Sequence, residues 1–110
     1  MSDRVERIGL NEALFRAVNE EMDQLSGTFT ADPRTLSIVC ECGSETCLER
    51  IEVLPDDYSA ARADSTLFLT KPGHELPDTE HVVTRTDRFL LVRKDPGRPA
   101  EIARETDVSD

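Results

Sequence analysis

The N-terminal 26 residues carry apolar side chains at the three- and four-residue spacing of a helix. This spacing gathers apolar residues on one side of a helix, so we expect an amphipathic N-terminal helix whose stripe packs on a sheet. The same stripe could also pair with a partner protein or with a second copy of the chain. The stripe consists of Val5, Ile8, Leu14, Phe15, Val18, Met22 and Leu25.

Alternating apolar and polar residues predict a β-hairpin at residues 36–53. The first strand would cover residues 36–42 and the second would include Ile51 and Val53, which alternate with Arg50 and Glu52. Side chains two residues apart share one face of a strand, and residues 43–46 offer a turn that begins with glycine. The hairpin would therefore carry the cysteines of the chain at its tip.

The pattern beyond the hairpin predicts a short helix, a strand and a second hairpin. Pro55 suits the first turn of a helix that would run towards Asp64. This helix would bury Tyr58, Ala60 and Ala61. Residues 66–70 read as a strand that ends in a Pro-Gly turn, and residues 81–85 and 89–93 as a hairpin. We therefore expect an α+β domain with a small, mostly antiparallel sheet and its helices on one face.

The C-terminal residues 95–110 look different from the rest of the chain. They open with two prolines around Gly97 and offer only Ile102 and Val108 as large apolar side chains. We therefore expect one domain at residues 1–94, followed by an acidic, flexible tail at 95–110 without a packed element.

The charge of the chain limits its partners. The 110 residues include 23 acidic and 13 basic ones, which gives a formal net charge of −10. Nucleic acids and anionic membranes are bound through basic surfaces, so we expect neither and instead expect a protein partner. The N-terminus has no apolar signal segment, and no run of residues is long and apolar enough to cross a membrane. These features favour a cytoplasmic protein.

The clearest chemistry lies in three clustered cysteines and a distant histidine. Cys40, Cys42 and Cys47 follow the pattern Cys-x-Cys-x4-Cys, and His74 stands on the Pro-Gly turn. Three thiolates and one imidazole form a common tetrahedral ligand set for structural zinc. The backbone would have to bend at Cys42 to bring the sulfurs together, and Gly43 permits such a bend. We predict a non-catalytic Cys3His zinc site, with His81 as the reserve fourth ligand.

Other interpretations of the same residues stay open. The cysteines could be small buried apolar residues, and the histidines a turn residue and an exposed strand residue. Alternatively, Cys47 could pair with Cys40 or Cys42 in a thiol-based redox or metal sensor. Catalysis would need an open zinc position. If His74 were not a ligand, zinc could hold water there with help from Glu41, Glu45 or Glu75, although Glu41 should point away.

Several of these motifs together resemble those of a group of short bacterial proteins, mostly actinobacterial. The shared features are Cys-Glu-Cys-x4-Cys at residues 40–47, a helix with Tyr58 in its first turn, and Pro-Gly-His at residues 72–74 before a Val-rich hairpin. The resemblance covers residues 36–94 and implies that the cysteine motif and His74 occur together, with no activity attached. Leu54 departs from the Ser or Thr expected before the second helix.

Overall fold

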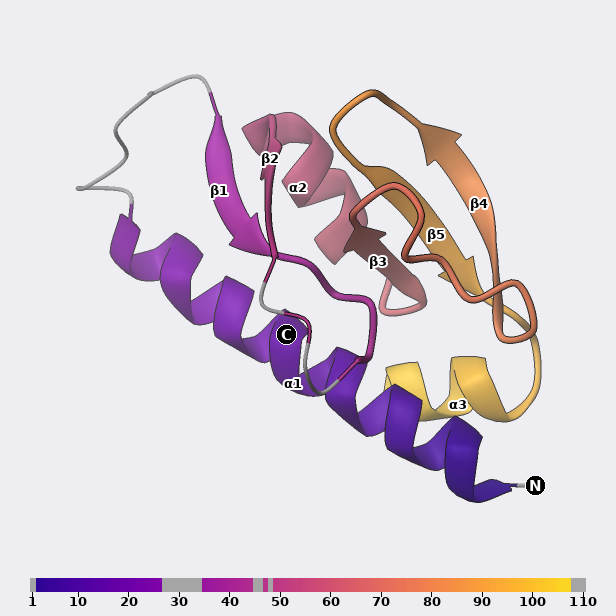
Figure 1. Cartoon of the computed structure of the whole chain (residues 1–110). Helices are drawn as coiled ribbons and strands as arrows, with labels where there is room; N and C mark the ends of the chain where they lie inside the picture. The colour runs from indigo at the N-terminus through magenta and orange to yellow at the C-terminus, as the bar shows by residue number, and fades with distance from the viewer. Residues whose placement is uncertain (1, 27–34, 45–46, 48, 108–110) are drawn as a thin grey trace.

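The fold is an α+β arrangement, as the sequence predicts (Figure 1). The computed structural model describes residues 2–26, 35–44, 47 and 49–107. In chain order the elements are α1 (Ser2–Ser26), β1 (Leu36–Val39), β2 (Arg50–Val53), α2 (Pro55–Arg62), β3 (Leu67–Thr70), β4 (Glu80–Arg85), β5 (Leu90–Lys94) and α3 (Arg98–Glu105).

The strands form two antiparallel sheets where the sequence predicted one. β1 and β2 make the first hairpin, with Leu36 opposite Val53, and the second sheet has the strand order β3-β5-β4. Among the described residues, one backbone hydrogen bond joins the sheets beyond the end of β1, where the Glu41 amide donates to the Leu69 carbonyl at 2.9 Å. The predicted hairpins and the β3 strand are confirmed. β1 ends at Val39, three residues before the predicted end at residue 42, whereas β3, β4 and β5 lie within one residue of their expected bounds.

Helices cover both faces of the three-stranded sheet, which corrects the expectation that they share one face. On one face, Leu69 and Phe89 pack with Tyr58 and Ala61 of α2 and with the inner side chains of the first hairpin. On the opposite face, the buried side chains of Phe68, Leu90 and Val92 pack with Ala103 of α3. β3 is buried on both faces, which explains its uninterrupted apolar sequence. Ala60, in contrast to the prediction, is exposed.

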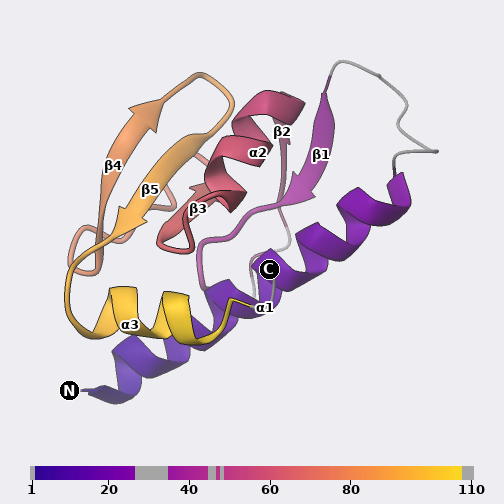
Figure 2. The same cartoon turned by 180° about the vertical axis from the view of Figure 1, so that it is seen from behind.

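α1 runs beside β1 and α3 with a polar face turned inward, so the predicted packing of its apolar stripe is wrong (Figures 1 and 2). Its buried residues are Gly9, Glu12, Arg16 and Asn19, spaced three and four apart. Of the predicted stripe, Leu14 and Val18 are exposed, and Val5, Ile8 and Phe15 are half-buried. Met22 and Leu25 lie outside the described side chains.

Buried polar contacts attach α1 to the domain. The ammonium of Lys94, from β5, lies 2.9 Å from the carboxylate of Glu12 and 3.0 Å from that of Glu80. The Arg16 guanidinium donates to the carbonyls of Ser65 and Ala103 and stacks over the Phe68 ring. Hydrogen-bonded polar and charged side chains thus take the place of the apolar contacts that the sequence pattern predicted.

A third helix occupies residues expected to form an unpacked tail. α3 runs from Arg98 to Glu105 and buries Ala100, Ile102 and Ala103. Ile102 packs so closely on α1 that a Cβ on Gly9 would lie 2.6 Å from its Cγ2 atom. α3 is buried between two neighbours, because Ile102 packs on α1 whereas Ala103 packs on the three-stranded sheet. Among the described residues, no helix is long and apolar enough to cross a membrane.

Candidate metal centre

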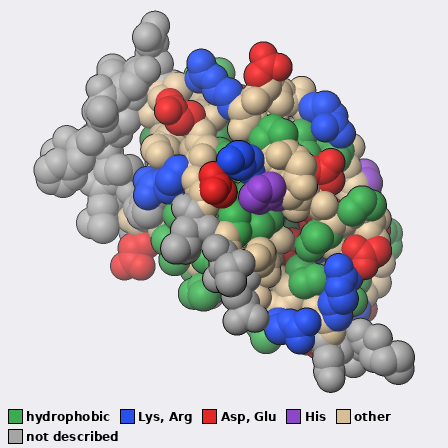
Figure 3. Space-filling model, viewed as in Figure 1, with side chains coloured by type: hydrophobic (Ala, Val, Ile, Leu, Met, Phe, Trp, Pro, Cys, Tyr) green, Lys and Arg blue, Asp and Glu red, His purple; other side chains and the backbone are tan. Residues whose placement is uncertain are grey.

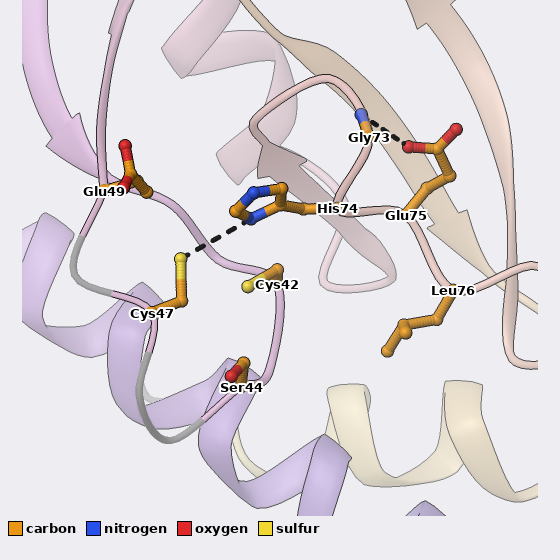
Figure 4. Close-up of a pocket in the computed structure, with 8 residues that line it drawn as sticks. All are labelled: Cys42, Ser44, Cys47, Glu49, Gly73, His74, Glu75 and Leu76. Atoms are coloured by element: carbon orange, nitrogen blue, oxygen red, sulfur yellow. Dashed lines mark hydrogen bonds between the residues drawn. The ribbon is translucent and has the colours of Figure 1, made fainter.

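Three cysteines and a histidine from separate loops meet beside the junction of the two sheets. Cys40 and Cys42 follow β1, Cys47 precedes β2, and His74 follows β3. One sulfur or ring nitrogen from each residue lies within 4.8 Å of those of the other three. In Figure 4 the His74 ring points towards Cys47, with the Cys42 sulfur directed into the space between the two loops. The structure thus brings together all four predicted ligands.

The bend that the sequence analysis required occurs at Gly43. β1 ends at Val39, and Gly43 has a φ of +82°, in the region that favours glycine. Gly43 also lies against α1, where an added Cβ would be 2.9 Å from Cγ2 of Ile8. Asn11 fixes the same turn, because its side-chain amide donates to the Gly43 carbonyl at 3.0 Å. The loop therefore turns Cys42 back towards Cys40 under the support of α1.

A hydrogen-bonded turn places His74 at the cluster. Its backbone amide donates to the Lys71 carbonyl at 2.9 Å, which closes the predicted Pro-Gly turn. The Nδ1 atom of His74 lies 3.6 Å from Sγ of Cys40 and 3.5 Å from Sγ of Cys47. The imidazole thus faces two of the three thiols.

Each cysteine sulfur accepts a hydrogen bond from a backbone amide. The Lys71 amide donates to the Cys40 sulfur at 3.1 Å, the Ser44 amide to Cys42 and the Glu49 amide to Cys47. Backbone N–H groups favour the charged form of a side chain that accepts from them. The loops thus offer partial positive charge to three thiolates.

The cysteines share protons as a group. A hydrogen bond from Cys40, aided by the Ser44 amide and His74, lowers the pKa of Cys42 to about 4. The same bond to Cys42, with burial, raises the pKa of Cys40, and burial raises that of Cys47. One thiolate is therefore stabilised by protons on its neighbours. A cation at the centre would replace these protons, because a coordinated thiol is deprotonated.

Glu41, which stands between Cys40 and Cys42, anchors their loop on the side away from the sulfurs. The carboxylate of Glu41 is completely buried and accepts both terminal nitrogens of Arg62, at 3.0 and 2.8 Å. It also accepts from the Asn19 side chain at 2.7 Å and from the Leu69 amide at 3.0 Å. Glu41 thus points away from the sulfurs, as predicted. The sequence analysis missed the roles of Arg62 and Asn19, although a buried Glu already implies a cationic partner.

The open side of the cluster faces a pocket of about 410 Å³ that Cys42, Cys47 and His74 help to line. Lys71 and Glu49 form an exposed ion pair of 2.8 Å beside it. Figure 3 shows a histidine near the centre of this face, with basic and acidic side chains beside it and apolar ones around it. The cluster therefore borders an open pocket, with Cys47 half-buried and the other two cysteines buried.

The remaining candidates from the sequence lie apart from the cluster or in other roles. His81 is exposed, with its Nδ1 atom 3.1 Å from a carboxylate oxygen of Asp95, so His74 and not His81 joins the cysteines. Glu75 lines the pocket but accepts from the Gly73 amide at 2.9 Å. Glu45 lies outside the described residues.

Comparison of the chain with protein-family models, with curated proteins and with solved structures finds no match. Any function must therefore be argued from the site itself.

Proposed function

We propose that the protein is a small zinc-stabilised interaction module in which Cys40, Cys42, Cys47 and His74 bind one structural Zn²⁺. The observation that carries the proposal is the convergence of four donor atoms, all within 4.8 Å of one another, from two separate loops. A cluster of three sulfurs and one imidazole nitrogen matches the soft and borderline ligands that zinc prefers.

The distances support tetrahedral coordination. Bonds of about 2.3 Å to sulfur and about 2.0 Å to nitrogen place S and N about 3.6 Å apart in a tetrahedron. The two measured separations between His74 Nδ1 and a cysteine sulfur are 3.6 and 3.5 Å. A zinc ion would therefore need little movement of Cys40, Cys47 or His74.

The ligand count favours a structural role over catalysis. Four protein ligands fill the tetrahedral positions of zinc, whereas a catalytic zinc keeps one position for water or substrate. The ion would also tie the first hairpin to the loop after β3, beside the hydrogen bond that joins the two sheets. Zinc-finger peptides gain about 10–16 kcal/mol from such a site, a large contribution for 110 residues of which 37% are hydrophobic.

The charge supports a protein as the partner. A net charge of −10 disfavours nucleic acids and anionic membranes. It is compatible with a basic or neutral protein surface, and with the cytoplasm as the compartment of a thiolate-bound zinc.

The test is the metal content of purified protein, measured by elemental analysis after exposure to zinc and dialysis. We expect one zinc per chain in the wild type, loss of zinc in Cys42→Ser and weaker binding in His74→Ala. His81→Ala is the matched control, because it removes a histidine outside the cluster and should keep the metal. A folded wild type without metal would overturn the proposal, as would equal losses in the two histidine variants.

A second function is favoured by one observation, the half-exposed position of Cys47 at the pocket. In a thiol sensor, hydrogen peroxide would accept two electrons from the thiolates of Cys47 and Cys42. With two protons from solvent, this step forms one disulfide and two water molecules, and zinc leaves. Zinc release by peroxide that is reversed by a dithiol would support this function. Retention of zinc during oxidation of the protein would exclude it.

A further inference from the structure

α1 presents a narrow apolar stripe to solvent on the side opposite its buried polar face. Leu10, Leu14 and Val18 are 55%, 58% and 37% exposed. Their spacing of four residues, at about 100° per residue, keeps them within one face of the helix. Exposed apolar residues are ordinary when scattered, but three in a row on one rigid helix form a contact surface.

Charged residues of opposite sign close the stripe at its two ends. Arg7 precedes Leu10 by three residues and Glu21 follows Val18 by three, and both are exposed. Their positions fall on the same face of the helix as Leu14. From its N-terminal to its C-terminal end, the stripe therefore carries one positive residue, three apolar residues and one negative residue.

This order is self-complementary when two copies of α1 run antiparallel. With a two-fold axis at Leu14, each residue faces the one equally far on the other side of position 14. Leu10 then faces Val18, and Arg7 faces Glu21, twice in each dimer. A parallel pair would instead place Arg7 against Arg7 and Glu21 against Glu21, which is unfavourable.

We propose that the protein forms a homodimer through this stripe, with the two α1 helices antiparallel and Leu14 at the two-fold axis. The surface is isologous, the commonest kind in soluble homo-oligomers. The proposed dimer goes beyond the zinc function and does not depend on it. The loop that carries the cysteines lies against the opposite side of α1, where Gly43 is close to Ile8 and Glu12.

α1 is suited to present such a surface because its inner side is fixed at several points. Glu12, Arg16 and Asn19 bind buried partners in β5, α3 and the loop after β1. At the N-terminal end, Glu6 forms an ion pair with Arg98 and Arg4 one with Asp78. A rigid helix loses little conformational freedom on association. The dimer should nevertheless be weak, because three apolar side chains per copy form a small interface and both copies are acidic.

The test is sedimentation of the zinc-loaded protein from about 10 µM to about 1 mM at about 0.15 M salt, where a Debye length of about 8 Å screens distant charges. We expect a concentration-dependent monomer–dimer equilibrium. Leu14→Asp should be monomeric throughout, since two carboxylates would meet at the axis. Leu54→Asp is the matched control, because Leu54 is 51% exposed but lies before α2; it should still dimerise.

Charge exchange tests the antiparallel arrangement. Arg7→Glu and Glu21→Arg should each weaken the dimer roughly tenfold, because each change affects two symmetric contacts. The double variant should regain most of the lost affinity. A wild type that stays monomeric, a dimer that Leu14→Asp leaves intact, or a double variant without recovery would overturn the proposal. Zinc content and circular dichroism of the same samples separate these outcomes from failure of the metal site or of folding.

Discussion

Glu41 should be essential for stability although it binds none of the proposed metal ligands. Its buried carboxylate accepts four hydrogen bonds, two of them from Arg62, whose side chain is only 11% exposed. Glu41→Gln keeps the shape of the side chain but removes its charge. The variant therefore leaves a buried guanidinium without its counter-charge and aims an amide NH2 group at other donors.

The expected loss follows from the burial of this pair. Removing one partner of a buried ion pair costs about 3–5 kcal/mol, and the remaining amide oxygen of Gln should keep the loss near about 3 kcal/mol. The matched control is Asp78→Asn, which breaks the exposed pair with Arg4 and should cost less than about 1 kcal/mol.

The assay is urea unfolding of both variants with zinc present, followed by circular dichroism. A double-mutant cycle with Arg62→Met isolates the pair, and we expect the double variant to lose less than the sum of the two single losses. Glu41→Gln should also weaken zinc binding, because Glu41 stands between two of the proposed ligands and holds their loop in place. A loss below about 1 kcal/mol, or additive single losses, would refute this reasoning.

Three further predictions concern α1 and the glycine of the metal loop. Burial raises the pKa of Glu12 to about 8 from 4.5, so the folded state retains a proton that the unfolded state releases, and stability should fall as the pH rises between these values. Glu12→Gln, with Lys94 and Glu80 unchanged, should make the melting temperature fall less steeply as the pH rises. A slope equal to that of the wild type would contradict the assignment of this pH dependence to Glu12. Gly9→Ala should lower the free energy of unfolding by about 1–3 kcal/mol in spite of the higher helix propensity of Ala, because its Cβ meets Ile102; a more stable variant would show that α3 can shift. Gly43→Ala should weaken zinc binding in a titration, because Ala is strained at a φ of +82°, and unchanged affinity would place the bend elsewhere.

The local signals in the sequence predict much of the fold. The alternation around Ile38 and Ile51 predicts the first hairpin, and the Pro-Gly pair predicts the turn that carries His74. The metal cluster could be predicted because the chemistry of zinc restricts ligands to a few residue types. The hairpin and turn signals act within a few residues, and the metal-site signal depends on side-chain chemistry alone. Neither kind of signal requires knowledge of tertiary contacts.

The orientation of α1 could not be predicted from its periodicity. The chain has two candidate faces there, one with Leu14 and Val18, the other with Glu12, Arg16 and Asn19. Periodicity favours burial of the first, but the second is buried because Lys94, Glu41 and the Ala103 carbonyl supply partners from distant positions. The same limit applies to α3, whose Ile102 packs on a glycine 93 positions earlier. Such partners become visible only when the chain is folded.

The junction between the two sheets explains why the polar face of α1 and the metal cluster occur together. The two sheets meet where the backbone amide of Glu41 donates to the carbonyl of Leu69. The Glu41 carboxylate strengthens this contact from one side by accepting the Leu69 amide, and it is itself held by Asn19 of α1 and Arg62 of α2. On the other side, zinc bound by Cys40 and His74 would connect the same two segments. A chain with a modest apolar core thus places a buried polar network and the proposed metal ligands on the two sides of the contact between its sheets.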